Sequence, residues 1–308
     1  MANRPTVSVV VPTYYRNDRL REAIDGALAQ RAPVEVIVVD GSGEAHARPV
    51  VEAFDGTGEG DGGEIEYVAQ ARDEGPHAAR SLGAERATGE YVQFLDDDDR
   101  LLPGKFEAQL PLLEADEAVG VVYSGLRDEE WGVVDPIPDV RGDVLEHALR
   151  LRTFPCVPST MLVDRAVVDD LLPFEHRHGA DDSGMKIELA RRTRFDYVDR
   201  PLVERGKPDG TLSSSWAHVD GRRYLVRRYA DLYDRYPDEV RRTAVRQTHY
   251  RAGNKHLEES AWSPSAPVEF ARAAYHTPER RGRYAATAVA SVFGRPGIDA
   301  ADRLGIAP

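Results

Sequence analysis

The sequence of 308 residues is poor in cysteine, in lysine and in long apolar segments. Its single cysteine, Cys156, excludes an intrachain disulfide framework and points to a reducing compartment. No apolar run approaches the roughly 20 residues of a membrane-spanning helix, and the first residues lack the apolar core of a signal peptide. We therefore expect a cytoplasmic protein. The hydrophobic content of 41% excludes a disordered or collagen-like chain, so a packed core is expected.

Only four of the 40 basic residues are lysines, and 53 acidic residues bring the net charge to −13. This balance disfavours a general binder of nucleic acid or of anionic membranes. An acidic protein with little lysine is typical of halophiles, in which a hydrated acidic surface maintains solubility. A GC-rich genome that prefers arginine codons would deplete lysine as well, and both explanations stay open.

The charge changes sign along the chain, because the segment from Asp220 onward is net basic. This change predicts a boundary near residue 218, with a first domain at 1–218 and a basic, wholly helical extension at 219–308. Within the extension, an apolar stretch at 284–293 is flanked by arginines. Such a stretch suits peripheral contact with the cytoplasmic face of the membrane, or an ordinary packed or dimerising helix.

The first hundred residues alternate buried-strand patterns with amphipathic helix patterns. This alternation predicts an α/β fold with a doubly wound, mostly parallel central sheet and flanking helices. Ligands of such sheets bind outside the carboxyl ends of the strands. The predicted strands are residues 6–11, 34–39, 65–69 and 91–95, and the helices are 18–30, 48–54 and 76–87. The segments 12–16, 40–42 and 96–99 should therefore share one rim.

The pattern beyond Arg100 is less regular. It predicts strands at 119–123, 160–163, 194–198 and 202–205, a loop or hairpin at 131–140, and helices at 143–151, 164–172 and 183–192. After His218 the chain should be helical.

Four consecutive aspartates, Asp96 to Asp99, follow the fourth predicted strand. Alone, an acidic run is usually a solvated turn. At the end of a buried strand, however, hard carboxylate oxygens suit Mg²⁺ or Mn²⁺, with diphosphate oxygens completing the coordination shell. The position on the predicted ligand rim favours the metal site.

Two further segments of the rim could hold a nucleotide. Asp40 could accept hydrogen bonds from a nucleobase or a ribose, or could serve only as a cap or turn residue. In the segment from Pro12 to Arg16, an aromatic side chain could stack on a base and Arg16 could meet phosphate. Taken alone, this segment is only a strand-to-helix turn.

The segments VSVVVPTYYR, VIVVDGS, GPHAARSLG and ATGEYVQFLDDDD occur in this order. Over residues 6–205 the chain resembles an inverting family 2 glycosyltransferase with the GT-A fold. The resemblance implies transfer of a sugar from a nucleoside-diphosphate sugar with a divalent cation. By position, the residues that it assigns to the nucleotide, its phosphates and the sugar are Pro12, Thr13, Tyr14, Arg16, Asp40, Arg80, Asp96 and Asp97. Asp98 matches the metal ligand of the family's DxD motif. The asparagine of the family's A-R-N stretch is replaced by Ser81.

The pair Asp181-Asp182 resembles the E-D dipeptide before the family's W-L-R helix, which implies that Asp182 is the catalytic base. The tryptophan is missing here. Without the resemblance, an acidic pair before a helix is commonly a cap and a first-turn charge. Lys207 follows the last predicted strand, where relatives place a cationic loop over the diphosphate.

For the acceptor, the resemblance to haloarchaeal members implies a lipid-linked (dolichol phosphate) oligosaccharide in N-glycosylation of the S-layer, with a hexose or hexuronic acid as the sugar. Alternatives are another cell-surface polysaccharide, a sugar nucleotidyltransferase, or a non-catalytic carbohydrate-binding protein. The loop of residues 12–17 lacks the glycines expected of a nucleotidyltransferase. The missing G-x-G-x-x-G disfavours a dehydrogenase.

Overall fold

The computed structural model describes residues 6–54, 64–177, 179–206, 215–277 and 281–306. The chain forms two compact units. The first, here the sheet unit, comprises residues 1–145, 153–176 and 185–209, and the second, here the helical unit, comprises 146–152, 177–184 and 210–308. Two short segments before residue 218 thus belong to the helical unit. The predicted domains at 1–218 and 219–308 remain a prediction.

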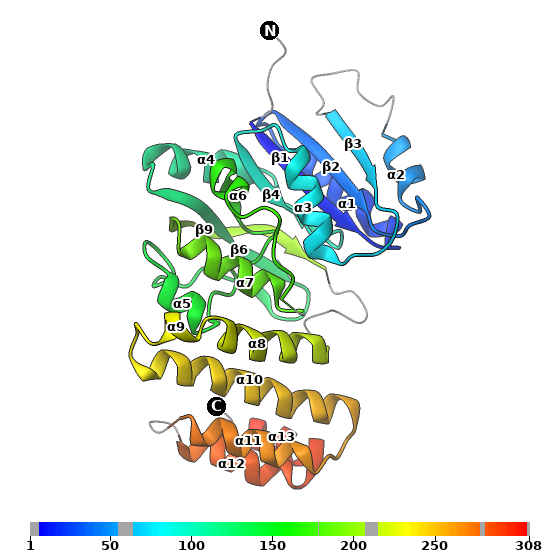
Figure 1. The fold of residues 1–308 in the computed structure, drawn as a ribbon. Coiled ribbons are helices and arrows are strands. Elements are labelled where there is room, and N and C mark those ends of the chain that lie inside the picture. Colours follow the sequence, from blue (N-terminus) through cyan, green and yellow to red (C-terminus); the bar gives the residue numbers. More distant parts are fainter. Residues whose placement is uncertain (1–5, 55–63, 178, 207–214, 278–280, 307–308) are drawn as a thin grey trace. The chain divides into compact units, whose positions relative to one another are not determined.

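In the described part of the sheet unit, nine strands form one sheet in the order β3-β2-β1-β4-β8-β6-β9-β5, with β7 paired to β6. The predicted parallel arrangement of the first four strands is confirmed (Figure 1). These strands are β1 (Val7–Thr13), β2 (Val34–Asp40), β3 (Glu64–Ala69) and β4 (Tyr91–Phe94). Every residue of β1 is buried, as its β-branched sequence requires of a strand covered on both faces.

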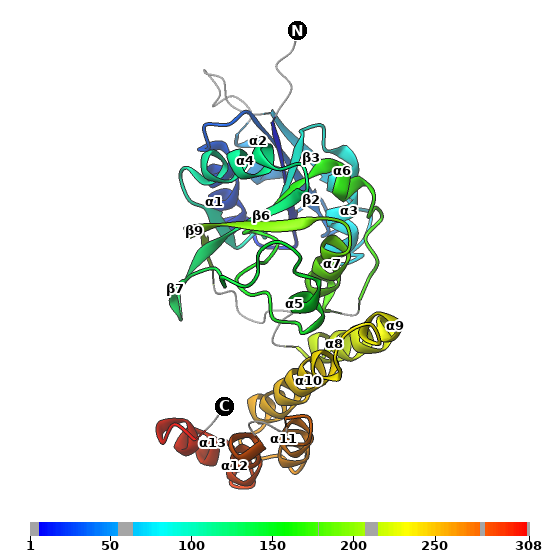
Figure 2. The same ribbon diagram turned by 90° about the vertical axis from the view of Figure 1, so that its left-hand side faces the viewer.

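Helices cover both faces of this parallel half (Figure 2). Val9 and Val11 of β1 belong to the core that also contains Leu20 and Ile24 of α1 (Asn17–Leu28). Val10 points to the opposite face, where α3 (Pro76–Arg86) approaches so closely that a Cβ at Gly83 would lie 2.3 Å from it. Because side chains alternate along β1, they pack against helices on both faces of the sheet.

The other half of the sheet is mixed. There β6 (Val119–Asp128) pairs parallel with β9 (Arg194–Arg205) and antiparallel with β7 (Gly132–Val134) and β8 (Leu162–Asp164). The short β5 (Asp99–Leu101) pairs antiparallel with β9. The hairpin expected around residues 131–140 is confirmed by the β6–β7 pair.

Several predicted elements need correction. The strands expected at 194–198 and 202–205 are one strand, β9, because register shifts absorb the interruption at Pro201. The helices expected at 143–151 and 164–172 shorten to α5 (Leu145–Leu149) and α6 (Arg165–Asp169). Asp181 and Asp182 lie inside the first turn of α7 (Asp181–Ala190), not before it. The helix α4 (Lys105–Ala115) was not predicted, since Pro111 interrupts its pattern. The remaining helix of this unit is α2 (Arg48–Glu52).

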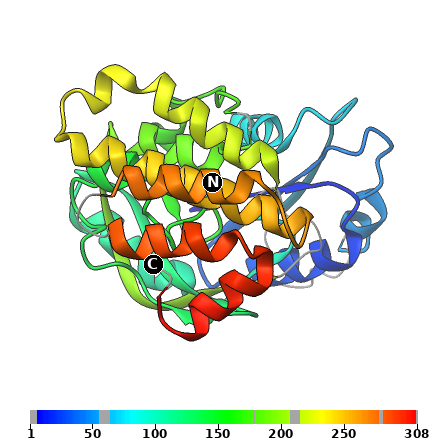
Figure 3. The same ribbon diagram turned by 90° about the horizontal axis from the view of Figure 1, so that it is seen from below.

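Beyond His218 the described residues of the helical unit contain helices and their connections and no strand, as predicted (Figure 3). Gly253 lets α10 and α11 approach, because a Cβ there would lie 2.8 Å from the Phe270 ring. The helices are α8 (Trp216–Arg228), α9 (Ala230–Tyr233), α10 (Asp238–Glu259), α11 (Ser265–Tyr275), α12 (Arg281–Ser291) and α13 (Gly294–Arg303).

Candidate functional site

The carboxyl ends of β1, β2 and β4 meet at one rim of the sheet. Thr13 is the register partner of Asp40, and the Leu95 amide donates to the carbonyl of Val10 at 2.9 Å. The residues that follow β4 therefore run beside the turn that follows β1. The structure thus brings together the three segments that the order of the strands predicts to converge.

Asp97 joins the acidic segment to the turn after β1. The Thr13 hydroxyl donates to its Oδ2 at 2.8 Å, and Arg16 Nη1 donates to its Oδ1 at 3.1 Å. Burial raises the pKa of Asp97, while the bonds from Thr13 and Arg16 oppose this rise. Both carboxylate oxygens already have protein donors, so Asp97 ties the two strand ends to each other. Its predicted contact with the nucleotide remains a prediction.

Asp98 is a largely buried aspartate whose charge one arginine balances in part. Its side chain is 12% exposed, and Arg16 Nη1 approaches it at 3.5 Å. Burial and the neighbouring charges of Asp96 and Asp97 raise the pKa of Asp98 to about 6, against the opposing pull of Arg16. Concentrated hard oxygen donors with too little positive charge around them fit a divalent cation such as Mg²⁺ or Mn²⁺.

Asp99 separates from the three residues before it, because it begins β5 and is buried. Burial and the charges of Asp96 and Asp98 raise the pKa of Asp99 well above its usual range. Its Oδ1 accepts from the Gly206 amide at 3.2 Å. A Cβ at Gly206 would lie 2.2 Å from the Asp98 carbonyl oxygen, so only glycine fits between β9 and the acidic segment.

Arg80 reaches the acidic segment from α3. Its Nη2 donates to Asp96 Oδ1 at 2.5 Å, and the Asp96 amide donates to Ser159 Oγ at 3.2 Å. Arg80 is buried, and its Nε has no hydrogen-bond partner in the part of the chain that the structure describes. A buried guanidinium with a spare donor beside carboxylates could bind an anionic ligand of the same site.

Asp40 organises the turn that follows β2. Its Oδ1 accepts from the Ser42 amide at 2.9 Å, and its Oδ2 accepts from the Ala47 amide and the Tyr67 hydroxyl, both at 2.8 Å. Burial alone would raise the pKa of Asp40, but these donors outweigh it and lower the pKa. The side chain therefore does act as a turn residue. A carboxylate accepts about four hydrogen bonds, so one acceptor position of this buried side chain remains after these three.

Aromatic and amide groups lie next to Asp40. Tyr14 is 51% exposed, and its ring lies edge-on to Tyr15 with centroids 4.8 Å apart. A Cβ on Gly41 would lie within 4 Å of both Tyr14 and Gln70 Oε1. This buried amide oxygen has no hydrogen-bond partner among the described residues. Sequence analysis missed Gln70, although its position directly after β3 on the same rim was a usable signal.

Asp182 belongs to the helical unit. The Arg177 amide donates to Asp181 Oδ1 at 2.5 Å, and Ser183 Oγ lies 3.4 Å from Asp182 Oδ1. Burial lowers the pKa of Arg222 to about 10, and the charge of Asp182 opposes that shift. The charge of Asp182 thus acts on a buried cation. Its role as base remains a prediction.

The charge of Asp182 acts on His218 as well. Burial and then the charge of Arg222 lower the pKa of His218, and the charge of Asp182 acts in the opposite direction. The predicted cationic loop at Lys207 lies outside the described residues. Cys156 is fully buried, as expected of a small packed residue.

The model of the family described as "Glycosyl transferase family 2" matches residues 8–172. Over 111 residues the chain is 32% identical to a putative teichuronic acid biosynthesis glycosyltransferase of Bacillus subtilis, covering 36% of this chain and 42% of that protein. Over 130 residues it is 32% identical to the Campylobacter jejuni GalNAc(5)-diNAcBac-PP-undecaprenol beta-1,3-glucosyltransferase. This match covers 42% of this chain and 40% of that protein. The first listed relatives are matched over 28% to 42% of their own length.

Solved structures share the fold at low sequence identity. A fragment of S. aureus TarS matches with a TM-score of 0.65 and 15% identity, over 97% of this chain and 92% of that chain. A Pyrobaculum calidifontis mannosyltransferase, solved with GDP-Man and Mn²⁺, matches with a TM-score of 0.61 and 20% identity, over 99% and 85%. Among the described residues, no helix combines the length and apolar character needed to cross a membrane. The GT-A fold expected from the sequence is confirmed, and the chain belongs to glycosyltransferase family 2.

Proposed function

We propose that this chain is a metal-dependent, inverting glycosyltransferase that uses a nucleoside-diphosphate sugar. The convergence of Asp40, Arg16 and the acidic segment at one rim of the sheet supports the proposal most directly. This rim offers an aromatic surface, hydrogen-bonding groups and carboxylates side by side, which are the groups needed by a base, a ribose and a metal-bound diphosphate. The family membership agrees with it.

The nucleoside would bind at the Tyr14 end of the rim. There Pro12 and Thr13 end β1, Tyr14 offers a ring for stacking, and Asp40 offers an acceptor to a base or ribose. Gln70 adds an unpaired, buried amide oxygen. Because that oxygen only accepts, it suits a base edge that presents an N–H group, as uracil and guanine do. Solved structures of S. aureus TarS hold UDP-GlcNAc or UDP, and that of the P. calidifontis mannosyltransferase holds GDP-Man.

The diphosphate would bind at the acidic end. Asp98, with Asp96 beside it, would hold the divalent cation, and the two arginines Arg16 and Arg80 would meet phosphate oxygens. A bound Mg²⁺ or Mn²⁺ supplies Lewis-acid stabilisation of the departing diphosphate. Asp97 would keep this end aligned with the nucleoside end through its bonds to Thr13 and Arg16.

In the proposed reaction, Asp182 takes the proton from an acceptor hydroxyl while that oxygen bonds to the anomeric carbon. The bond between the anomeric carbon and the diphosphate oxygen breaks with its electron pair leaving on the diphosphate. A single displacement from the opposite face inverts the anomeric configuration. Arg222 and His218, whose pKa values the charge of Asp182 influences, are proposed as positioning residues for its carboxylate.

The acceptor is proposed to be a lipid-linked saccharide or another cell-surface glycan. The B. subtilis relative is named for teichuronic acid biosynthesis, and the C. jejuni relative is named as a glucosyltransferase for an undecaprenol-diphosphate saccharide. Both relatives support this class. Within it, the resemblance to haloarchaeal enzymes favours a dolichol-phosphate oligosaccharide of S-layer N-glycosylation and a hexose or hexuronic acid donor. Assembly of another surface polysaccharide is the alternative.

Donor binding and turnover by the purified full chain test the proposal. We expect Mn²⁺ to strengthen binding of UDP or GDP in calorimetry, and a matching nucleotide sugar to be turned over. Asp98→Asn should lower nucleotide affinity in Mn²⁺ by about 100-fold and abolish turnover. Asp135→Asn, which removes an exposed carboxylate of the same unit, is the matched control and should change neither. Equal nucleotide binding and turnover by the Asp98→Asn variant and the wild type would refute the proposal.

A further inference from the structure

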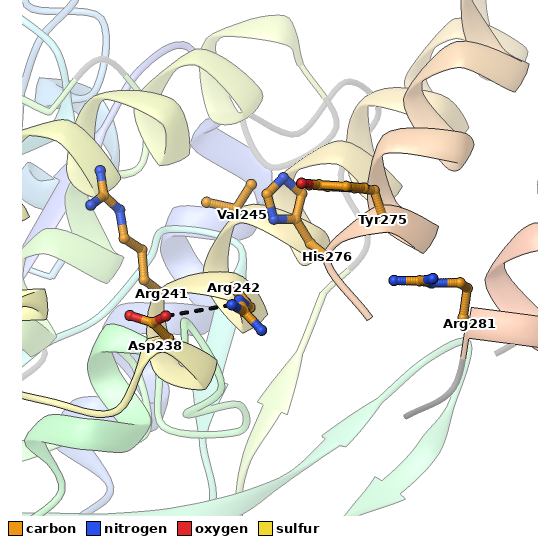
Figure 4. A pocket seen from close by; sticks show the side chains of 7 residues that line it. All are labelled: Asp238, Arg241, Arg242, Val245, Tyr275, His276 and Arg281. Carbon is orange, nitrogen blue, oxygen red and sulfur yellow. Dashed lines mark hydrogen bonds and ion pairs between the residues drawn. The ribbon is translucent and has the colours of Figure 1, made fainter. Parts of the chain in front are cut away.

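The helical unit contains a cavity of about 390 Å³ that shares no residue with the rim of the sheet (Figure 4). Its walls come from the first turns of α10, the end of α11 and the start of α12. The polar side chains that line it are Asp238, Arg241, Arg242, Tyr275, His276 and Arg281. Three arginine side chains from two separate helices thus line one small volume, and the guanidinium group of Arg241 extends away from those of Arg242 and Arg281 (Figure 4).

Among the described residues, acidic side chains neutralise little of the positive charge that lines this cavity. Arg242 pairs with Asp238 at 3.4 Å, and that carboxylate is 88% exposed, so the pair is weak. Arg241 and Arg281 form no ion pair with an acidic side chain in the part of the chain that the structure describes. Within the described ranges of the chain, these arginines therefore leave an excess of positive charge beside one cavity.

Neutral groups complete the lining. The phenol of Tyr275 is 74% exposed, and its ring lies edge-on to His276 with centroids 5.2 Å apart. The imidazole of His276 stacks on that of His249 at 5.9 Å, and His249 in turn bonds to Glu269 at 2.6 Å. Both Tyr275 and His276 carry groups that can donate a hydrogen bond to an anion.

We propose that this cavity is a second ligand site of the protein, which binds the phosphate group of an organic phosphate through Arg241, Arg242 and Arg281. A guanidinium group matches a phosphate with two parallel N–H donors, and three such groups exceed what a carboxylate ligand requires. The volume lies in the range of small-molecule sites and is larger than a phosphate ion alone, so part of the organic substituent also fits. The bound phosphate group would belong either to a membrane lipid headgroup or to a soluble phosphate compound.

The test uses the full chain without divalent cations, at fixed ionic strength. Calorimetric titration with inorganic phosphate and with glycerol phosphate should detect binding, which the double variant Arg241→Gln/Arg281→Gln weakens by at least about tenfold. The matched control, Arg227→Gln/Arg303→Gln, removes the same charge from exposed arginines elsewhere in the helical unit and should bind like the wild type. Thermal melting should be the same for all three proteins. A variant that retains charge, Arg241→Lys/Arg281→Lys, should keep part of the affinity if the site is folded and the fork geometry matters.

Vesicles distinguish the two sources of the phosphate. Phosphatidic acid, a monoester, and phosphatidylglycerol, a diester, are compared in phosphatidylcholine vesicles of equal anionic charge. Preferential sedimentation with phosphatidic acid that the cavity variant abolishes assigns the site to a lipid headgroup. Soluble phosphate binding without such sedimentation assigns it to a soluble compound. If the wild type binds no phosphate probe, or if the control double variant loses as much affinity as the cavity variant, the proposal is wrong.

Discussion

The acidic rim of the sheet unit and the arginine-lined cavity of the helical unit follow the same electrostatic principle with opposite sign. At the rim, carboxylates are buried at strand ends, and Arg16 and Arg80 balance only part of their charge. At the cavity, exposed guanidinium groups lie on helices, and Asp238 balances only one of them. Burial makes the charge imbalance at the rim costly, which suits the proposed metal site, whereas exposure makes the imbalance at the cavity cheap, which suits the looser binding proposed there.

The largest expected effect is a loss of turnover, without a loss of nucleotide binding, when Asp182 is replaced. Asp182→Asn should lower the turnover number by about 1,000-fold, because the acceptor hydroxyl loses its base, and should leave nucleotide affinity unchanged. Steady-state kinetics and calorimetry on one preparation measure both quantities. Asp231→Asn, an exposed carboxylate of the same unit, is the control. Turnover near the wild-type level would eliminate Asp182 as the base.

The bond between Thr13 and Asp97 should couple the two ends of the rim. Thr13→Val leaves a buried carboxylate oxygen without its donor, and should cost about 1–3 kcal/mol of unfolding free energy in urea titrations. A double-mutant cycle with Asp97→Asn isolates the pair, since the two losses should not add. Additive losses would mean that the contact contributes nothing to the native state.

Gln70→Leu should separate function from stability. Removing an unpaired buried amide oxygen should leave the melting temperature equal or higher, yet weaken UDP or GDP binding by about tenfold if the oxygen meets the base. Unchanged nucleotide affinity would remove Gln70 from the base site.

The smallest effect concerns pH at the cavity. Burial, and then the charges of His249 and Arg242, lower the pKa of His276, so its imidazole is neutral at neutral pH. The other charged groups facing it are Arg241 and Asp238 of α10 and Arg281 of α12; Tyr275 is its neighbour on α11. A bound dianion offsets the repulsion and raises this pKa. Affinity should then rise as pH falls from 7 to 5.5, by up to about tenfold for each pKa unit gained.

Sulfate is the probe for this measurement, because it stays doubly charged throughout that range. His276→Gln should flatten the pH dependence while the arginines still bind the anion. If the affinity of this variant for sulfate still rises as the pH falls, the pH dependence belongs to another group, such as His249.

The convergence of distant segments could be predicted because it depends on strand order alone. Buried strands that alternate with helices must be parallel, and parallel strands carry the residues at their carboxyl ends to one rim. Asp40, Asp96 and Asp98 were found in this way. Because the interiors of these strands are apolar, the polar residues that follow them mark the strand ends in the sequence.

What could not be predicted depends on contacts between segments far apart in sequence. Asp99 leaves the acidic run because β5 pairs with β9, and no pattern near residue 99 reveals that pairing. Both oxygens of Asp97 are taken by donors from the turn after β1. Gln70 is a single polar residue with no motif around it. Each case needs the partner's position, which sequence spacing does not contain.

The double attachment of Asp97 has a consequence for ligand affinity. Its bond to Thr13 links residues 84 positions apart, so the nucleoside end and the phosphate end of the rim are held in one relative orientation before any ligand arrives. The entropic cost of aligning them is met during folding and does not recur on binding. A nucleotide long enough to span both ends should therefore gain affinity from preorganisation, while a fragment that occupies one end gains none.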